Sequence, residues 1–211
     1  MKKALTRNTC CTTCVAYCFF GAKGELMPPK PKFSKEEIIQ TAMQIAKEKG
    51  LSAITARELA DRLSVSSRPI YSYFESIDEL KNEVIKNIMK IFAEELYKKR
   101  PDANQFLSIG LNLISFVRNN KEYFNIIKNE VTNFVNLNGI DTYTNLAVDK
   151  VSNSLEFSGF SKKKIKDTYL KMAIFSHGLA DFVYYGHIDG SEQFVRRLLE
   201  ETGKAIMNDS N

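Results

Sequence analysis

The feature that most constrains this 211-residue chain is a helix-start signal that occurs three times between residues 34 and 79. Each time, Ser or Thr is followed three residues later by Glu, which is the pattern of a capping box at the first turn of a helix. The three pairs are Ser34 with Glu37, Thr55 with Glu58, and Ser76 with Glu79. The pairs lie 21 residues apart. The helices between them are therefore short and need a shared core to be stable.

The spacing of apolar residues predicts where these helices end. We expect a first helix that ends at Gly50, a second through Leu63, a third over 67–74 that Ser66 caps, and a fourth over 77–98. Two short helices joined by about three residues, and held on a further helix, form a helix-turn-helix. A plain three-helix core with no role in DNA binding has the same pattern and stays open at this point.

A residue-level pattern favours the first alternative. The run Thr55-x-Arg57-x-Leu59-Ala60-x-x-Leu63-x-Val65-Ser66, then Ile70-Tyr71-x-Tyr73-Phe74-x-Ser76-x-x-Glu79-Leu80, closely resembles the DNA-binding domain of the TetR family of bacterial regulators. The resemblance covers about residues 33–81. Two positions depart from it. Ser64 replaces the turn glycine and must adopt the turn without glycine's freedom. Ile77 replaces a common phosphate-contacting Lys, for which Lys81 can substitute.

The resemblance implies which residues meet DNA. The second helix would cross the phosphate backbone and the third would enter the major groove. The expected contacts are Thr55, Arg57, Ser66, Ser67, Arg68, Pro69, Tyr71, Ser72, Tyr73 and Lys81, with Lys30 and Lys32 as an N-terminal arm. Arg68 is the best base reader because its guanidinium can bond O6 and N7 of guanine together. Core packing is the alternative for Tyr71, and simple solubility is the alternative for Lys30 and Lys32.

The rest of the chain shows only helical patterning. We expect helices at about 103–118, 121–132, 141–158, 163–186 and 191–207. The predicted fold is all-α: an N-terminal three-helix helix-turn-helix domain (33–81), joined by a long helix to a C-terminal helical domain (82–211) for ligand binding and dimerisation.

Residues 101–211 hold 14 of the 23 aromatic residues. Most must pack in the core, but some can line a ligand cavity between helices. The candidates for contact with a small-molecule effector are Phe106, Phe116, Tyr123, Phe124, Tyr143, Tyr169, Phe175 and His177. For His177 a packed or interface position is the alternative.

By the same resemblance, the last two helices form a homodimer interface as a four-helix bundle. The expected interface residues are Leu170, Ile174, Gly178, Phe182, Tyr185, Phe194 and Leu198. Gly178 would permit close approach of a partner helix. A dimer presents two recognition helices, which suits a palindromic double-stranded DNA operator.

The opening segment, 1–32, differs from the rest. Residues 1–35 carry a net charge of +6, and all four cysteines lie at positions 10, 11, 14 and 18. A secretory signal, a metal or redox site, and a disordered basic leader upstream of Met27 are the three interpretations, and we favour the leader. The cysteine-free remainder fits a reducing, cytoplasmic compartment. The sequence contains no apolar run of about 18 residues, which is the length that a membrane-spanning helix needs.

The sequence argues against an enzyme. It has two His and lacks His-Glu-x-x-His, Gly-x-Ser-x-Gly and a glycine-rich phosphate loop. We expect no cofactor and no bound metal. The expected function is a dimeric repressor that a small-molecule effector releases from its operator. A redox- or metal-responsive regulator that uses the Cys cluster, and a helical interaction protein that has lost DNA binding, remain as alternatives.

Overall fold

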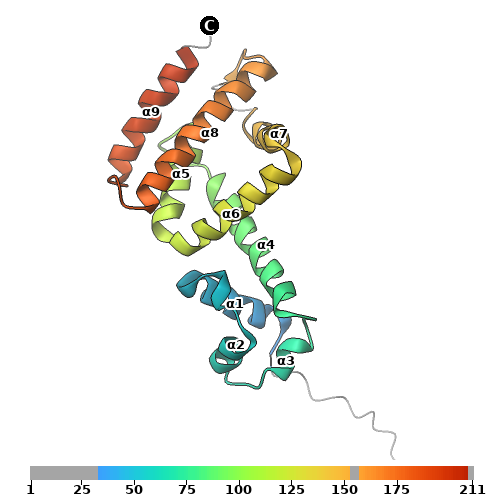
Figure 1. The fold of residues 1–211 in the computed structure, drawn as a ribbon. Helices are drawn as coiled ribbons and strands as arrows, with labels where there is room; N and C mark the ends of the chain where they lie inside the picture. The colour runs from blue at the N-terminus through green and yellow to red at the C-terminus, as the bar shows by residue number, and fades with distance from the viewer. Residues whose placement is uncertain (1–32, 153–156, 209–211) are drawn as a thin grey trace, which may run out of the picture. The chain divides into compact units, whose positions relative to one another are not determined.

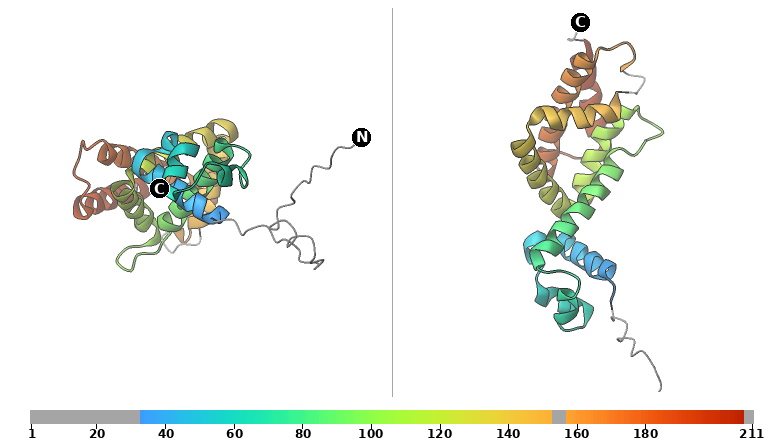
Figure 2. Two further views of the ribbon diagram at one scale, coloured as in Figure 1. Left: turned by 90° about the horizontal axis from the view of Figure 1, so that it is seen from below. Right: turned by 90° about the vertical axis from the view of Figure 1, so that its right-hand side faces the viewer.

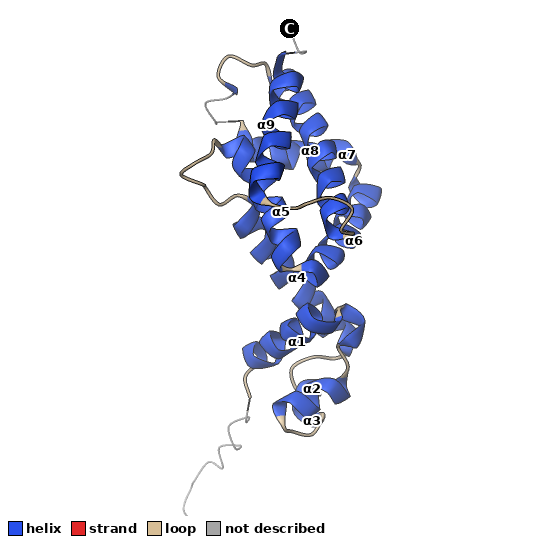
Figure 3. Ribbon diagram, turned by 90° about the vertical axis from the view of Figure 1, so that its left-hand side faces the viewer, coloured by secondary structure: helices blue, strands red, loops and turns tan. Residues whose placement is uncertain are grey.

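The computed structural model describes residues 33–152 and 157–208. The leader with its four cysteines, and with it Lys30 and Lys32, lies outside the described residues. The described residues belong to one compact unit, Phe33–Asn211. All of their regular secondary structure is helical, with no strand (Figure 3). The prediction of an all-α fold is confirmed.

The helices follow one another in a simple order (Figure 1). They are α1 (Lys35–Lys49), α2 (Ala56–Leu63), α3 (Arg68–Tyr71), α4 (Ile77–Leu96), α5 (Gln105–Asn119), α6 (Lys121–Asn138), α7 (Ile140–Val151), α8 (Lys162–Tyr184) and α9 (Glu192–Asn208), with a short 3-10 helix at Leu51–Ala53. The helices α1 to α3 lie at the start of α4, and α5 and α6 pack against α4 further along (Figures 1 and 2). The helices α8 and α9 pack on α5. The helices α8 and α9 form an antiparallel hairpin (Figure 1).

Helix α1 begins with the complete capping box that the sequence predicts. The Ser34 hydroxyl accepts a hydrogen bond from the Glu37 N–H at 3.1 Å, and the Glu37 carboxylate accepts one from the Ser34 N–H at 2.7 Å. The helix ends at Gly50, whose φ of 82° is open to glycine and rare for other residues.

Helices α2 and α4 have only half of the predicted capping box. The hydroxyls of Thr55 and Ser76 each accept a backbone N–H at 3.1 Å, as expected. The Glu58 carboxylate, however, bonds to Lys49 on α1, and the Glu79 carboxylate accepts the N–H of the residue before the cap. The helix starts are therefore predicted correctly, although two of the three boxes are not formed.

The third helix is shorter than the sequence suggests, and Ser66 does not cap it. It covers Arg68–Tyr71, and Ser67 precedes it without a side-chain cap. Beyond it the chain tightens into turns, with hydrogen bonds from Ser72 N to Pro69 O and from Tyr73 N to Ile70 O. The Ser72 hydroxyl also bonds to the Pro69 carbonyl at 2.6 Å, which competes with continued α-helix.

One apolar core joins α1 to α6, α8 and α9, and α4 runs through it. The α4 side chains at every fourth position, Leu80, Val84, Ile88 and Phe92, are buried and form one stripe. The stripe belongs to a single cluster that includes Ile38 of α1 and residues of α5, α6, α8 and α9. A smaller cluster packs α7 against α8 around Val148, Val151, Phe157, Ile165 and Tyr169.

Two C-terminal helices, α6 and α7, end at other residues than the sequence predicts. Helix α6 continues to Asn138, beyond the expected end at residue 132. It stops before Gly139, whose φ is 81°. Helix α7 ends at Val151 rather than at residue 158. Asparagines at 133 and 136 weaken helix propensity without breaking the helix, so glycine is the effective break.

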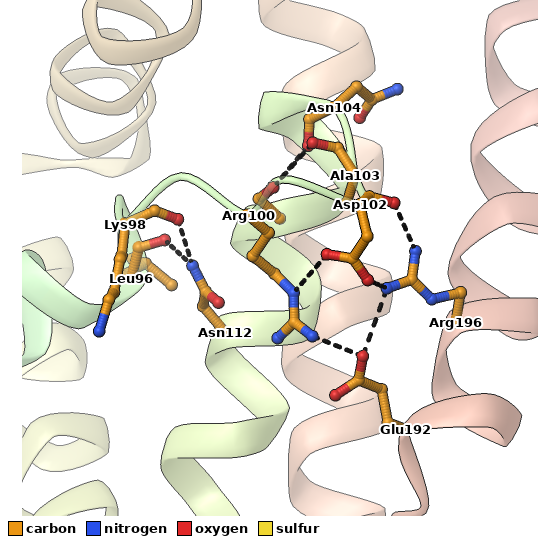
Figure 4. Close-up of polar contacts among 10 residues, drawn as sticks. Leu96, Lys98, Arg100, Asp102, Ala103, Asn104, Asn112, Glu192 and Arg196 are labelled. Atoms are coloured by element: carbon orange, nitrogen blue, oxygen red, sulfur yellow. Dashed lines mark hydrogen bonds and ion pairs between the residues drawn. The ribbon is translucent and has the colours of Figure 1, made fainter.

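Polar side chains fasten the connection between α4 and α5. The Asn112 amide donates to the carbonyls of Leu96 at 3.2 Å and Lys98 at 2.7 Å. Figure 4 shows Arg196 of α9 facing Asp102, and its guanidinium donates to the Asp102 carboxylate and, at 3.1 Å, to its carbonyl. These contacts hold the connection against both α5 and α9.

Within the described ranges, no helix is both long enough and apolar enough to cross a membrane.

We expect Ser64→Gly to raise the free energy of unfolding by about 0.5–1 kcal/mol. Ser64 ends α2 in the left-handed region, at φ 54° and ψ 44°, and is the single non-glycine residue with positive φ among those described. Glycine removes the steric strain but adds freedom to the unfolded chain, so the gain is a fraction of the strain. Urea unfolding measures it. Ser64→Ala keeps the Cβ and should give no gain; an equal gain for both variants would contradict this explanation.

Candidate nucleic-acid interface and ligand cavity

The turn between α2 and α3, together with α3, exposes a run of polar side chains. Ser66, Ser67, Arg68 and Ser72 are all exposed, and Tyr71 is 52% exposed. The exposed Tyr71 ring therefore does not serve the core, which was its alternative position. Hydroxyls and a guanidinium on one short segment can bond to phosphates and to base edges.

Arginines in this region differ in their partners. Among the described residues, Arg68 has no ion-pair partner, so its guanidinium is available to a ligand. Arg57 on α2 is 93% exposed and lies 3.9 Å from Asp61, one turn further along. Such an exposed pair contributes little to stability and is easily exchanged for another anion.

Other expected DNA contacts are engaged inside the protein. The Tyr73 hydroxyl donates to the Phe33 carbonyl at 3.0 Å and thus ties the end of α3 to the start of α1. Lys81 is half-buried with its ammonium 3.5 Å from Asp78. The half-buried Pro69 lies in the first turn of α3. Thr55 uses its hydroxyl oxygen to cap α2 and is exposed.

A network of four charges holds α2 on α1. Glu58 accepts hydrogen bonds from Lys49 at 2.9 Å and Arg62 at 3.1 Å, and Arg62 also bonds to Glu48 at 2.6 Å. The Lys49 ammonium, and then the Arg62 guanidinium, hold the pKa of Glu58 below its usual range. Two acids balance two bases, so the network adds no net charge to the surface around α2.

A cavity of about 400 Å³ lies between α4, α5, α8 and α9. Three of the predicted effector residues line it: Phe106, Tyr169 and His177. The remaining lining residues are Phe92, Leu96, Asn104, Leu107, Ile109, Gly110, Leu113, Met172, Ala173, Ser176, Leu199, Glu200, Gly203, Lys204 and Met207. The walls are mainly apolar with a few polar groups, as in small-molecule sites.

Four further effector candidates lie elsewhere. Phe116 packs edge-on against Phe92 with ring centroids 5.1 Å apart. The Tyr123 hydroxyl donates to the buried Met43 carbonyl at 2.9 Å. Phe124 packs on a tyrosine of α8, and Phe175 packs against the main core. The side chain of Tyr143 lies outside the described residues.

Most of the cavity residues were not predicted from the sequence, although one of them, Gly203, gave a signal there. Gly203 lies inside a helical pattern, far from any turn, and such a glycine has a packing or binding reason. Ser176 directly precedes the predicted His177. Burial lowers the pKa of His177, and the negative charge of Asp181 opposes this only in part. The imidazole is therefore neutral near pH 7.

The outer face of α8 is apolar and exposed. Ile174, Phe182 and Tyr185 are exposed by 66%, 54% and 60%, and their spacing puts them on one side of the helix. Gly178 lies on the same side, and a Cβ there would meet nothing within 4 Å. Leu170, Phe194 and Leu198 are half-buried beside this face or on α9. Large side chains exposed in one patch mark an interaction surface.

No group of three or more His, Cys, Asp or Glu suited to a metal ion occurs in the ranges 33–152 and 157–208. The Cys cluster lies outside them.

Comparison with known proteins agrees with this geometry. Residues 38–84 match the family described as bacterial regulatory proteins, tetR family. Over 62 residues the chain is 29% identical to the HTH-type transcriptional repressor KstR2 of Mycolicibacterium smegmatis. That match covers 29% of this chain and 30% of the relative, so it spans less than a third of that protein.

A solved structure gives the same fold over a longer stretch. A TetR-like transcriptional regulator from Rhodococcus sp. RHA1 superposes with a TM-score of 0.56 at 18% identity, over 80% of this chain and 92% of that one. The multidrug binding protein EbrR, solved with ethidium, gives a TM-score of 0.49 at 15% identity, over 82% and 98%.

The family match coincides with the helix-turn-helix, and the all-helical fold is that of the Rhodococcus structure. Over its helix-turn-helix region, the chain is similar to the TetR family of bacterial regulatory proteins. The resemblance read from Thr55 to Leu80 is thereby confirmed.

We expect Gly203→Ala to raise the free energy of unfolding by about 0.5–1 kcal/mol, because it improves helix propensity. A Cβ at this position would lie 3.9 Å from Met172 and 4.0 Å from Phe106, at ordinary contact distance. Gly110→Ala is the matched control. Its Cβ would lie 2.8 Å from Leu199, so we expect no gain. Urea unfolding compares the two; equal gains would mean that Leu199 moves into the cavity at no cost.

Proposed function

We propose that the chain is a dimeric cytoplasmic repressor that binds a palindromic DNA operator through α3 and releases it when a small molecule occupies the cavity. The observation that carries the proposal is the exposed Arg68 without an ion-pair partner among the described residues, with exposed hydroxyls before and after α3. A guanidinium in this position can read guanine, while the hydroxyls fix the register on phosphate.

Residues beside α3 divide into two roles in this proposal. Arg57, Thr55 and Tyr71 are exposed and meet phosphates. Tyr73 and the charge network behind α2 hold the recognition segment in place, since their polar atoms already have partners. Lys30 and Lys32 add the N-terminal arm.

The exposed apolar face of α8 supports dimerisation. Two copies that pack Ile174, Phe182 and Tyr185 against each other remove these side chains from water, which favours association. The open space at Gly178 lets the helices approach closely. A two-fold axis there gives each operator half-site its own α3.

The cavity supports control by a ligand. It is bounded by Phe92 and Leu96 at the end of α4, and the first half of α4 packs on the helix-turn-helix. An effector shifts the protein between two forms only by its differential affinity for them. The form that fits the effector would hold α4, and with it α3, at a spacing unsuited to the operator.

Arg68→Ala should weaken operator binding by about 1–3 kcal/mol and relax the preference at one base position. Electrophoretic shifts with DNA from upstream of the protein's own gene, and with single-base variants of it, measure both effects. Arg57→Ala is the control, because a lost phosphate contact weakens binding to every sequence and flattens the salt dependence by about one unit. Uniform loss with Arg68→Ala would make Arg68 a phosphate contact, and no shift of the wild type would end the proposal.

Ile174→Lys should weaken the dimer at least about tenfold, since a buried isoleucine contributes about 1.5–3 kcal/mol and lysine adds a like-charged pair across the axis. Sedimentation equilibrium gives the dissociation constant. Ile91→Lys is the matched control, because Ile91 is an exposed isoleucine on α4, away from the α8 face. If Ile174→Lys leaves the dimer intact, the interface lies elsewhere.

A further inference from the structure

One hydroxyl in the cavity wall has no hydrogen bond to another described residue. Ser176 on α8 lines the cavity and is only 8% exposed. No hydrogen bond joins its hydroxyl to another described residue. The fully enclosed side-chain atoms without a hydrogen bond are Nε of Arg100 and Oγ1 of Thr168, so the Ser176 hydroxyl is open to the cavity that it lines. The contents of the cavity are the available source of a partner.

The remaining wall leaves room for a large apolar body. Aromatic and aliphatic side chains of four helices surround the space, among them Phe92, Phe106, Leu113 and Met172. Gly203 adds volume, because no neighbour lies closer than 3.9 Å to the Cβ that any other residue would carry. A side chain at position 203 would not clash with its neighbours, but it would fill part of the cavity.

Charge is balanced around this space. Glu200 and Lys204 are the two charged residues that line the cavity; they lie one turn apart on α9, are opposite in sign, and form no ion pair with a described residue. Lys204 is exposed and Glu200 is half-buried. The groups nearest Ser176 in sequence are neutral, since burial disfavours the charged imidazole of His177. A charged group buried beside Ser176 would therefore lose its hydration without a counter-charge.

We propose that the cavity takes an uncharged amphipathic molecule, with an apolar body and one neutral oxygen group, a hydroxyl or a carbonyl, that hydrogen-bonds to Ser176. This inference rests on the proposed function only in placing the effector in this cavity. It excludes acids and amines of the same body as preferred ligands.

Three probes with one body and different head groups test the class: decan-1-ol, decanoate and decylammonium. Isothermal titration calorimetry on the full chain at pH 7, without DNA, gives each affinity. We expect decan-1-ol to bind at least about tenfold more tightly than either ion, because a buried charge loses more than one neutral hydrogen bond gains. Equal or tighter binding of either ion would overturn the proposal, and so would absence of binding by the alcohol.

Two substitutions test the site itself. Ser176→Ala should weaken decan-1-ol binding about three- to tenfold, the range of one neutral hydrogen bond. Ser115→Ala, on the exposed side of α5, is the control and should change nothing. Gly203→Leu should abolish binding by filling the cavity while keeping the fold, since leucine is the better helix former. Unchanged affinity in Ser176→Ala would mean that water satisfies the hydroxyl, and unchanged affinity in Gly203→Leu would place the ligand elsewhere; either result overturns the proposal.

This test of the ligand class can succeed or fail independently of the proposed function. Calorimetry contains no DNA, so a protein that fails to shift its operator can still confirm the ligand class. A chain that binds decan-1-ol through Ser176 but keeps its operator shift unchanged by the alcohol would contradict ligand-controlled release and leave the class standing.

Discussion

The structure depends on the burial of one stripe of α4. Leu80 and Val84 pack among the short helices α1 to α3, and Ile88 and Phe92 continue the same core toward the C-terminal helices. The short helices are not stable alone, so they fold only on this stripe. The same stripe ends at Phe92, which also lines the ligand cavity. One continuous apolar core therefore reaches from the short helices to the cavity.

The start of the chain's helical part was well predicted because its signals are local. Ser34, Thr55 and Ser76 each cap the helix that follows, as their side-chain chemistry requires. The prediction was wrong for the carboxylates of two of the three paired glutamates, which do not close the capping box. Glu58 bonds to Lys49 and Arg62, and this choice depends on how α1 packs against α2. A sequence pattern shows the hydrogen-bond partner that lies nearby in the sequence, but not a competing partner that only the packing of another helix brings close.

The cavity was much harder to predict. An aromatic residue in a helix can face the core, a cavity or a neighbouring domain, and its type does not decide among them. Phe106 and Tyr169 face the cavity, whereas Phe116 faces Phe92 and Tyr123 bonds to α1. The residues that give the site its chemistry are small. Ser176 was overlooked because a serine without a neighbour in the sequence pattern has no signature until its burial is known.

The hydrogen bond from Tyr123 to the Met43 carbonyl has a mechanical consequence. It joins α6 directly to α1, whereas α4 joins α1 along a second line. Two separate contacts, one along α4 and one at α6, therefore fix the position of α1, and with it the helix-turn-helix, on the C-terminal helices.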